Sequence, residues 1–470
     1  MVPEAGPVVL RADELATAAS GRLVAGSPTA AVGGFSIDSR CVRAGDMFLA
    51  IRGDRVDGHR FVAEALEKGA AGVIVSDISA LPPRHAAIAI VVDDTVAALQ
   101  GIARVVRRRS AARVVAITGS IGKTTTKELT ATLLGARYRV FRNEGNLNNH
   151  IGLPLSLLEL RHRPEVAVVE LGMNHAGEIR TLVQLAEPEI RVWTNVAEVH
   201  AAFFDSVEAI ADAKAEVLEG ATTDTQLVVN AADPRAMARV GGFAGRVTTF
   251  GVSTNADVRA TELADLGLDG ARALVHTPEG HGTLRTSLLG EGNVANALAA
   301  IAVALRFHIP LDTLLAAVAR FRAQARRGEI TRLSEGVTVV DDSYNSNPTA
   351  LLGTLRTVGR DMGHTRRVAV LGEMLELGER AAPLHRACGV AAVEAGFTRV
   401  VVVGGAAVKS LAAGACAAGL PAGSVTTCAT SDAAADLVSD LARAGDLVLV
   451  KGSRGIRTDR VVDRLKADWT

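Results

Sequence analysis

The clearest chemistry in the chain belongs to a glycine-rich turn that follows an apolar run, Val114-Val-Ala-Ile-Thr118. The turn reads Gly119-Ser-Ile-Gly-Lys-Thr124, and the residues after it predict a helix over 125–134. Backbone N–H groups of such a turn, with the positive end of the helix, form a binding site for phosphate. Lys123 would reach the terminal phosphates and the Thr124 hydroxyl would hold Mg²⁺, so the turn predicts that the chain uses ATP. The predicted phosphate-binding residues are Gly119, Ser120, Ile121, Gly122, Lys123, Thr124 and Thr125.

One position departs from the generic phosphate loop, which has a glycine where this chain has Ile117. The chain carries the shorter form Thr118-Gly-x-x-Gly-Lys-Thr. An ordinary turn between a strand and a helix, with a chance Gly-Lys-Thr, is therefore the alternative. The order of strand, turn and helix favours the phosphate loop.

Further chemistry-bearing side chains follow the next two predicted strands. Glu170 lies at the carboxyl end of the apolar run over 166–171, Asn195 lies at the carboxyl end of the run over 191–196, and His200 follows that run. In open α/β sheets ligands bind at the carboxyl ends of the strands, where Glu170 would suit Mg²⁺ as a hard oxygen ligand. The alternatives are a glutamate that faces water and a structural histidine. The shared sheet edge favours metal ligation by both.

Lys214 falls on an apolar helical stripe marked by Val207, Ile210, Val217 and Ala221. Burial lowers the pKa of a lysine and exposes a nucleophilic neutral amine. Such an amine could react with CO₂ to give a carbamate, which is an oxygen ligand for a metal. The alternative is a lysine whose ammonium extends to solvent while its stem stays buried.

Composition excludes several classes of partner. The 470 residues carry 51 basic and 51 acidic side chains and only 3% aromatic residues, which argues against binding to nucleic acid or to an anionic membrane. The N-terminus lacks the features of a signal peptide, and there is no stretch of 18 apolar residues. The four cysteines have no metal-binding spacing. We therefore expect a cytoplasmic protein that does not insert into membranes.

Short apolar runs alternate with longer helical patterns along the chain, which predicts an α/β protein with mostly parallel sheets. We expect three domains, over 1–112, 113–325 and 326–470. The first boundary is placed at the basic stretch 104–113, which is interpreted as a solvated helix end rather than a nucleic-acid site. In the third domain the strand–helix alternation starts again and predicts a Rossmann-like unit.

Motifs from all three segments resemble those of the Mur ligase family of peptidoglycan synthesis. They are Asp38-Ser-Arg-Cys-Val-Arg-Ala-Gly-Asp, Gly145-Asn-Leu-Asn-Asn-His, Glu170-Leu-Gly-Met-Asn, Asp341-Asp-Ser-Tyr-Asn-Ser-Asn-Pro and Val450-Lys-Gly-Ser-Arg-Gly. The resemblance implies an N-terminal domain that binds a nucleotide sugar, a central ATPase domain and a C-terminal Rossmann-like domain. Two departures from the family pattern are Gly292, where many relatives have histidine, and the loop 197–204 around His200.

The resemblance also implies roles for individual residues. Asn296 would contact adenine, Asp342 the ribose, and Arg327 the phosphates. His200 and the carbamate of Lys214 would hold a second Mg²⁺ ion, beside the first at Thr124 and Glu170. The implied substrate-binding residues are Ser39, Arg40, Asn149, Tyr344, Asn345 and Asn347.

The implied reaction is ATP-dependent amide formation between UDP-N-acetylmuramoyl-tripeptide and D-alanyl-D-alanine through an acyl phosphate, by a monomer. An amino-acid-adding Mur ligase or a folate-type polyglutamate ligase is the nearest enzymatic alternative. A nucleotide switch that binds ATP without ligation is the alternative from another class.

Overall fold

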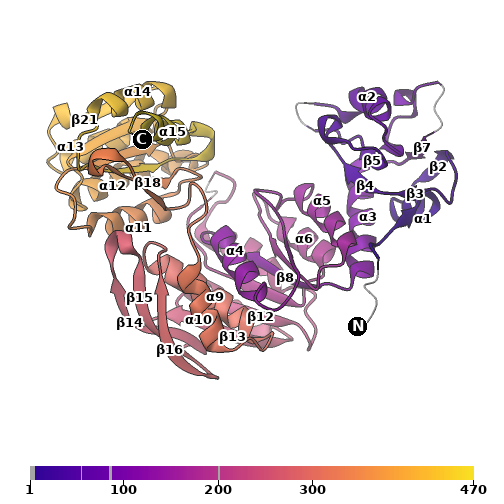
Figure 1. The fold of residues 1–470 in the computed structure, drawn as a ribbon, viewed down its shortest axis with the longest axis horizontal. Coiled ribbons are helices and arrows are strands. Elements are labelled where there is room, and N and C mark those ends of the chain that lie inside the picture. The colour runs from indigo at the N-terminus through magenta and orange to yellow at the C-terminus, as the bar shows by residue number, and fades with distance from the viewer. Residues whose placement is uncertain (1–5, 54–55, 84–86, 200–201, 470) are drawn as a thin grey trace.

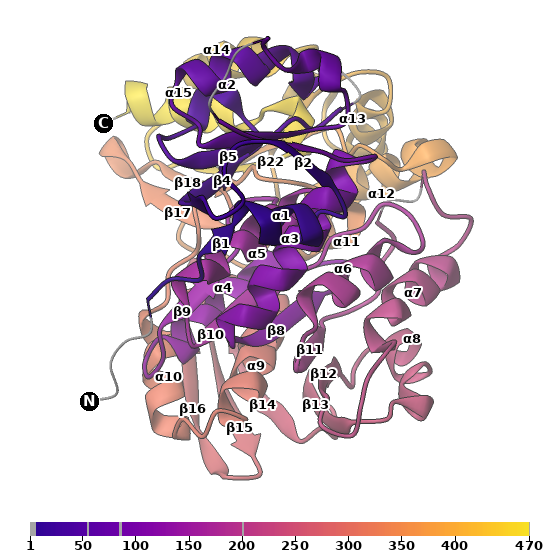
Figure 2. The same cartoon turned by 90° about the vertical axis from the view of Figure 1, so that its right-hand side faces the viewer.

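Three large β-sheets, each built from strands of one part of the sequence, organise the chain (Figure 1). The computed structural model describes residues 6–53, 56–83, 87–199 and 202–469. The central sheet lies between the N-terminal and C-terminal sheets, and the helices pack against the faces of all three (Figures 1 and 2). The predicted α/β class with mostly parallel sheets is confirmed, whereas the residues at which one domain ends and the next begins stay predictions.

The N-terminal sheet has the strand order β2-β7-β6-β5-β4, and only the β2–β7 pair is antiparallel. Its strands are β2 (Arg22–Ala25), β4 (Gly34–Ser36), β5 (Asp46–Leu49), β6 (Gly72–Val75) and β7 (Ile88–Val91). The short strands β1 (Leu10–Arg11) and β3 (Ala31–Val32) form a separate ribbon, and the helices are α1 (Ala12–Ala18), α2 (Val62–Glu67) and α3 (Thr95–Ser110). Strand β6 is buried at every position, as its continuous apolar sequence predicts.

The central sheet has nine strands in the order β16-β15-β14-β13-β12-β11-β8-β10-β9. The strands are β8 (Arg113–Thr118), β9 (Val140–Arg142), β10 (Val166–Glu170), β11 (Ile190–Trp193), β12 (Gln226–Asn230), β13 (Arg246–Val252), β14 (Val258–Asp265), β15 (Ala271–Thr277) and β16 (Gly280–Thr286). Strand β8 lies between β10 and β11 and is parallel to both. The strands that follow β8 in the sequence therefore lie first on one side of it (β9 and β10) and then on the other (β11 and β12). Open α/β sheets bind ligands at the carboxyl end of the strand where this change of side occurs.

The far edge of this sheet differs from the expected succession of parallel strands and crossover helices. Strand β15 is antiparallel to both of its neighbours, β14 and β16. Only short connections join these three strands, and such connections favour antiparallel hairpins. The central helices are α4 (Lys123–Leu134), α5 (Gly152–Leu158), α6 (Glu178–Ala186), α7 (Val207–Ala215), α8 (Pro234–Met237), α9 (Glu291–Leu305) and α10 (Leu311–Arg320).

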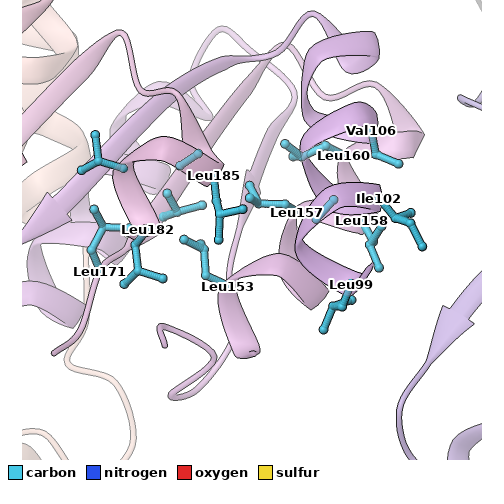
Figure 3. Close-up of a cluster of buried hydrophobic side chains, with 14 of the residues drawn as sticks. Leu99, Ile102, Val106, Leu153, Leu157, Leu158, Leu160, Leu171, Leu182 and Leu185 are labelled. Atoms are coloured by element: carbon cyan, nitrogen blue, oxygen red, sulfur yellow. The ribbon is translucent and has the colours of Figure 1, made fainter. Parts of the chain in front are cut away.

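Each large sheet with its helices is called a body below: N-terminal, central or C-terminal. Helix α3 packs against the central body as well as against the N-terminal body. Its Leu99, Ile102 and Val106 are fully buried in one core cluster with leucines of α5 and α6 (Figure 3). Arg107, from the basic stretch, is also buried and donates hydrogen bonds of 2.7 and 3.0 Å to the carbonyls of Ala186 and Glu187. The expectation of a solvated helix end is therefore wrong for Arg107, because its guanidinium binds the carbonyl groups at the end of α6.

The C-terminal sheet has the order β17-β18-β22-β19-β20-β21, with only the edge strand β17 antiparallel. Its strands are β17 (Glu329–Arg332), β18 (Thr338–Asp342), β19 (Arg367–Gly372), β20 (Arg399–Val403), β21 (Val425–Cys428) and β22 (Leu447–Lys451). Helices α11 (Pro348–Gly359), α12 (Ala381–Glu394) and α13 (Val408–Ala417) share one core cluster, and α14 (Ser431–Leu441) and α15 (Asp459–Asp468) share another. Within the described ranges, no helix has the length and apolar character needed to cross a bilayer.

Candidate active site

The predicted phosphate loop connects β8 to α4 and requires glycine at two positions. Gly119 has φ 146° and Gly122 has φ 84°, a region that other residues rarely adopt. A Cβ atom at Gly119 would lie 2.0 Å from Thr194 Oγ1, and one at Gly122 would lie 2.3 Å from Asn296 Oδ1. The loop therefore folds tightly onto its neighbours only because both residues lack a side chain.

Residues at the end of β11 hold this loop in place. Asn195 Oδ1 accepts a 2.9 Å hydrogen bond from the Ile121 N–H, and Asn195 Nδ2 donates 2.9 Å to the Ile121 carbonyl. The Ser120 N–H donates to the Asn195 carbonyl at 3.0 Å, and Thr194 Oγ1 donates 2.8 Å to the Ile121 carbonyl. The N–H groups of Ser120 and Ile121 are thus already bonded within the protein. Those of the first turn of α4, which begins at Lys123, have no partner four residues earlier in the helix.

Glu170, the last residue of β10, lies directly beside the loop. The Thr124 hydroxyl donates a 2.6 Å hydrogen bond to Glu170 Oε2, and Asn148 Nδ2 donates 2.8 Å to Oε1. Asn143 Oδ1 accepts a 2.9 Å bond from the Glu170 N–H. Glu170 is only 4% exposed, so the alternative of a glutamate that faces water is wrong.

The Lys123 ammonium folds back over the loop. Its Nζ donates to the carbonyls of Gly119 at 2.9 Å and Ser120 at 3.3 Å. Burial lowers the pKa of Lys123, while the negative charge of Glu170 raises it and the positive charge of Arg327 lowers it. The Lys123 ammonium is therefore close enough to Glu170 and Arg327 to interact with both charges.

Lys214, on α7, is 2% exposed, as the apolar stripe predicts. Burial and the charge of Lys123 shift the pKa of Lys214 well below its usual value, and Glu170 opposes that shift. The ammonium does not extend to solvent, and no described residue forms a hydrogen bond with its Nζ. Helix α7 ends at Ala215, so Val217, which stands in the 3-10 turn Glu216–Leu218, and Ala221 both lie beyond the helix whose stripe they were expected to mark.

His200 lies outside the described residues, so its proposed role as a metal ligand stays a prediction. The described residues on either side of it contact the C-terminal body. The Ala202 N–H donates a 3.0 Å hydrogen bond to the Glu376 carbonyl, and Arg380 forms an ion pair with Glu198. Glu198 and Ala202, which flank the undescribed positions, thus both contact the C-terminal body.

The donor set at Thr124 and Glu170 fits Mg²⁺. Mg²⁺ is commonly bound by one or two carboxylates together with phosphate oxygens of a substrate and water. The hydroxyl and carboxylate oxygens are already 2.6 Å apart. The part of the chain that the structure describes contains no group of three or more His, Cys, Asp or Glu side chains that would form a metal site by themselves.

Three further residues are predicted to contact the nucleotide. Asn296 lies beside the phosphate loop, and Arg327 and Asp342 belong to the C-terminal body. Asn296, on α9, accepts from Thr126 Oγ1 at 3.2 Å and donates to Asn293 Oδ1 at 3.0 Å. The Arg327 guanidinium lies 3.9 Å from the centre of the Tyr344 ring. Asp342 ends β18 and has its own set of partners in that body.

Asp342 is held by a buried lysine that the sequence reasoning did not single out. Lys451 Nζ donates 2.6 Å to Asp342 Oδ2 and 3.0 Å to the Asn345 carbonyl, and Lys451 is 4% exposed. Thr354 Oγ1 donates a further 3.0 Å bond to Asp342 Oδ2. The signal was present in Val450-Lys-Gly-Ser-Arg-Gly, since a lysine at the carboxyl end of a buried strand needs an anionic partner.

The residues predicted to bind substrate are distributed over all three bodies. Ser39 Oγ donates 3.1 Å to Glu64 Oε2, and exposed Arg40 pairs at 2.7 Å with Asp38 and lowers the pKa of that carboxyl to about 2. Asn149 Oδ1 accepts from the N–H groups of Ile151 and Gly152, at the start of α5. The structure uses its neighbour Asn148, rather than Asn149, to reach Glu170.

The remaining predicted substrate residues surround the turn after β18. Asn347 begins α11, where its Oδ1 accepts a 2.9 Å hydrogen bond from the Ala350 N–H. Asn345 is exposed, and Tyr344 packs under Arg327. Asn345 is therefore free to contact a ligand through its side chain, whereas Asn347 already has a structural role as a helix cap.

Comparison with known proteins covers nearly the whole chain. Family models match over 31–116 (Mur ligase family, catalytic domain), 117–304 (Mur ligase middle domain) and 326–454 (Mur ligase, glutamate ligase domain). The UDP-N-acetylmuramoyl-tripeptide–D-alanyl-D-alanine ligase of Bacillus subtilis is 32% identical over 92% of this chain and 93% of its own.

Solved structures give the same relationship. A crystal structure of MurF from Acinetobacter baumannii superposes with a TM-score of 0.88 at 29% identity, covering 98% of this chain and all of its own. MurF from Thermotoga maritima in complex with ADP has a TM-score of 0.80 at 28% identity, covering 92% of this chain and 97% of its own. The similarity therefore extends across all three bodies and is not confined to the phosphate loop.

Proposed function

The chain belongs to the Mur ligase family, and we propose that it uses ATP to join D-alanyl-D-alanine to UDP-N-acetylmuramoyl-tripeptide. The observation that carries the proposal is the hydrogen bond between Thr124 and Glu170 beside a glycine-dependent phosphate loop. The near-full-length relationship to the dipeptide-adding ligase of Bacillus subtilis supports the choice of substrates. The reaction is expected in the cytoplasm, where ATP is available.

Amide formation between a carboxylate and an amine is unfavourable in water, so the carboxylate must first be activated. In the proposed reaction a carboxylate oxygen of the tripeptide attacks the γ-phosphorus of ATP, and the bond between that phosphorus and the bridging β-phosphate oxygen breaks. ADP departs, and the tripeptide carboxylate has become an acyl phosphate. The amine of D-alanyl-D-alanine then attacks the acyl carbon, loses a proton and expels inorganic phosphate. Such transfers depend mainly on positioning and electrostatic stabilisation.

The residues of the loop supply that stabilisation. The first-turn N–H groups of α4 bind phosphate oxygens, and Lys123 leaves the carbonyls of Gly119 and Ser120 to neutralise the transferred phosphoryl group. Thr124 and Glu170 hold Mg²⁺, which when bound supplies further positive charge at the phosphates. Asn148 and Asn143 position Glu170, and Asn195 positions the loop.

Lys214 has a separate role in the proposal. Its lowered pKa makes the neutral amine available, and that amine attacks CO₂ to form an N–C bond with release of one proton. The resulting carbamate, with His200, would hold a second Mg²⁺ ion. Lys214→Ala should abolish ligation, and added short-chain carboxylic acids should restore part of it. Full activity of Lys214→Ala without such acids would contradict the carbamate.

The three bodies divide the substrates in this proposal. The N-terminal body, with Ser39 and Arg40, binds the nucleotide sugar, and the C-terminal body, with Tyr344 and Asn345, binds the dipeptide. Asn296, Arg327 and Asp342 contact the nucleotide from the central and C-terminal bodies. Closure of the bodies then excludes water from the acyl phosphate.

Phosphate release measured with substrate swaps tests the function. Release should require both UDP-N-acetylmuramoyl-tripeptide and D-alanyl-D-alanine. A single amino acid together with UDP-N-acetylmuramoyl-dipeptide should not replace these two substrates. Release with a single amino acid as acceptor would indicate an amino-acid-adding ligase. Hydrolysis that is independent of both substrates would indicate a nucleotide switch.

A further inference from the structure

A cavity of about 500 Å³ lies at the end of the central sheet opposite to the phosphate loop. Residues of α3, of the end of α6 and of the segments that precede β11 and β12 line it, including Arg104, Glu187, Glu189 and Thr225. Of these elements, α3 and α6 lie side by side in Figure 2 and are in contact. Strand β11 separates Glu189 from Thr194 and the phosphate loop, and the five residue steps between Glu189 and Thr194 span roughly 16 Å at about 3.3 Å per residue.

Two arginines that line the cavity have guanidinium N–H groups without partners among the residues that the structure describes. Arg191, the second residue of β11, is 3% exposed; its Nη1 donates 2.6 Å bonds to the carbonyls of Val217 and Glu219. Its Nε is enclosed and unbonded, and its Nη2 has no partner among the described residues. The Arg104 guanidinium forms no hydrogen bond or ion pair with any described residue, and its Nε is likewise enclosed and unbonded.

The carboxylates of the cavity do not neutralise these two arginines. Glu187 pairs with Arg108 at 2.6 Å, and Glu219 pairs with Arg180 at 2.5 Å. Glu189 lies 3.3 Å from Arg113 and 4.0 Å from Arg107. Asp224, the remaining carboxylate of the lining, is exposed and has no ion-pair partner in the described chain.

A buried arginine whose N–H groups lack acceptors is costly, because the desolvated donors lose their bonds to water. Burial alone lowers the pKa of Arg191, which agrees with the absence of a nearby carboxylate among the described residues. Guanidinium groups bind phosphate and carboxylate oxygens with two parallel N–H bonds. Thr222 and Thr225 also line the cavity, and their hydroxyl groups share a hydrogen bond of 3.3 Å.

We propose that this cavity is a second ligand site, which binds a small oxyanion between Arg104 and Arg191. The ligand carries a phosphate or a carboxylate group and is smaller than the nucleotide of the phosphate loop. Because Arg104 belongs to α3 and Arg191 to the central sheet, the bound anion links the helix that follows the N-terminal sheet to the central body. The site does not depend on the proposed ligase reaction.

Calorimetric titration of the full chain tests the proposal, with ADP at saturation so that the phosphate loop is occupied. Inorganic phosphate and citrate are titrated separately, because they distinguish a phosphate ligand from a carboxylate ligand. At least one of them should bind with one site per chain. Arg104→Gln should weaken that binding at least about tenfold, the effect of losing one charge-assisted contact.

Arg108→Gln is the matched control, since Arg108 lines the same cavity from the same helix but is engaged by Glu187. It should change anion affinity less than about twofold, whereas Arg191→Lys should weaken it as Arg104→Gln does. All three variants should keep their affinity for ADP, which shows that they are folded. Absence of binding by either anion, or equal binding by Arg104→Gln and the unchanged protein, would overturn the proposal.

Discussion

The Thr124 hydroxyl and the Glu170 carboxylate, 46 residues apart in the sequence, form a 2.6 Å hydrogen bond where β10 meets the start of α4. Because Asn148 holds the other carboxylate oxygen, Glu170 has little freedom to turn away from the loop. A metal ion bound here would meet two oxygen ligands already in place. This preorganisation is the basis of the first prediction.

Thr124→Val should weaken Mg²⁺ binding by about 10- to 100-fold while nucleotide affinity in the absence of Mg²⁺ changes little. The valine has nearly the same shape but lacks the ligand oxygen. A Mg²⁺ titration of phosphate release measures the effect. Thr124→Ser, which keeps the hydroxyl, serves as the control, and an unchanged Mg²⁺ requirement in Thr124→Val would contradict the role of Thr124.

Gly119→Ala should disrupt the phosphate loop, because φ 146° disfavours alanine and the new methyl group would lie 2.0 Å from Thr194 Oγ1. We expect a loss of stability of about 1–3 kcal/mol and an ADP affinity too weak to measure. Gly292→Ala is the control, since its new methyl group would have no neighbour within 4 Å and alanine favours α9, in whose first turn Gly292 lies. Urea unfolding and ADP titration measure the stability and the ADP affinity of both variants. Equal stability and equal ADP affinity of Gly119→Ala and Gly292→Ala would show that the phosphate loop does not require glycine at position 119.

Lys214→Met should stabilise the protein at neutral pH, by about 2 °C or more in unfolding temperature, because it removes a desolvated amine. The folded pKa of Lys214 is lowered, so between that value and the usual lysine pKa the unfolded chain binds a proton that the folded chain lacks. Stability of the unchanged protein therefore rises with pH across this window. Calorimetry in carbonate-free buffer should show a smaller difference at pH 9 than at pH 7, and a difference that grows with pH would refute the assignment.

Lys451→Met should destabilise the C-terminal body by about 3 kcal/mol, because Asp342 would lose its buried cationic partner. Asp342→Asn combined with Lys451→Met should recover part of the loss. A double-mutant cycle in urea unfolding measures the coupling energy between the two side chains. Additive effects of the two substitutions would mean that the 2.6 Å ion pair contributes no net coupling.

The sequence predicted those parts of the site whose chemistry is local. The Gly119–Thr124 turn needs its glycines and its following helix, and the apolar run that ends at Glu170 places that residue at the same sheet edge. The helical period of α7 likewise predicted the burial of Lys214. Each of these signals lies within a short window of the sequence and requires no knowledge of tertiary contacts.

The remaining features depend on contacts between distant segments. Asn148 and Asn149 are equivalent in the sequence, and only the path of the loop decides that Asn148 reaches Glu170 while Asn149 accepts hydrogen bonds from N–H groups at the start of α5. Arg107 stands in a run of arginines like its exposed neighbour Arg108, yet it lies against the end of α6. The antiparallel pairing of β15 with β14 and β16 follows from the short lengths of their connections.

The packing of α3 has a consequence for how the chain can be divided. Leu99, Ile102 and Val106 are covered by leucines that arrive later in the sequence, on α5 and α6. A fragment that stops after residue 112 would expose this whole apolar face to water and self-associate through it. During synthesis, too, the helix must wait for α5 and α6 to emerge, so the N-terminal segment cannot complete its packing before the chain has been made as far as α6.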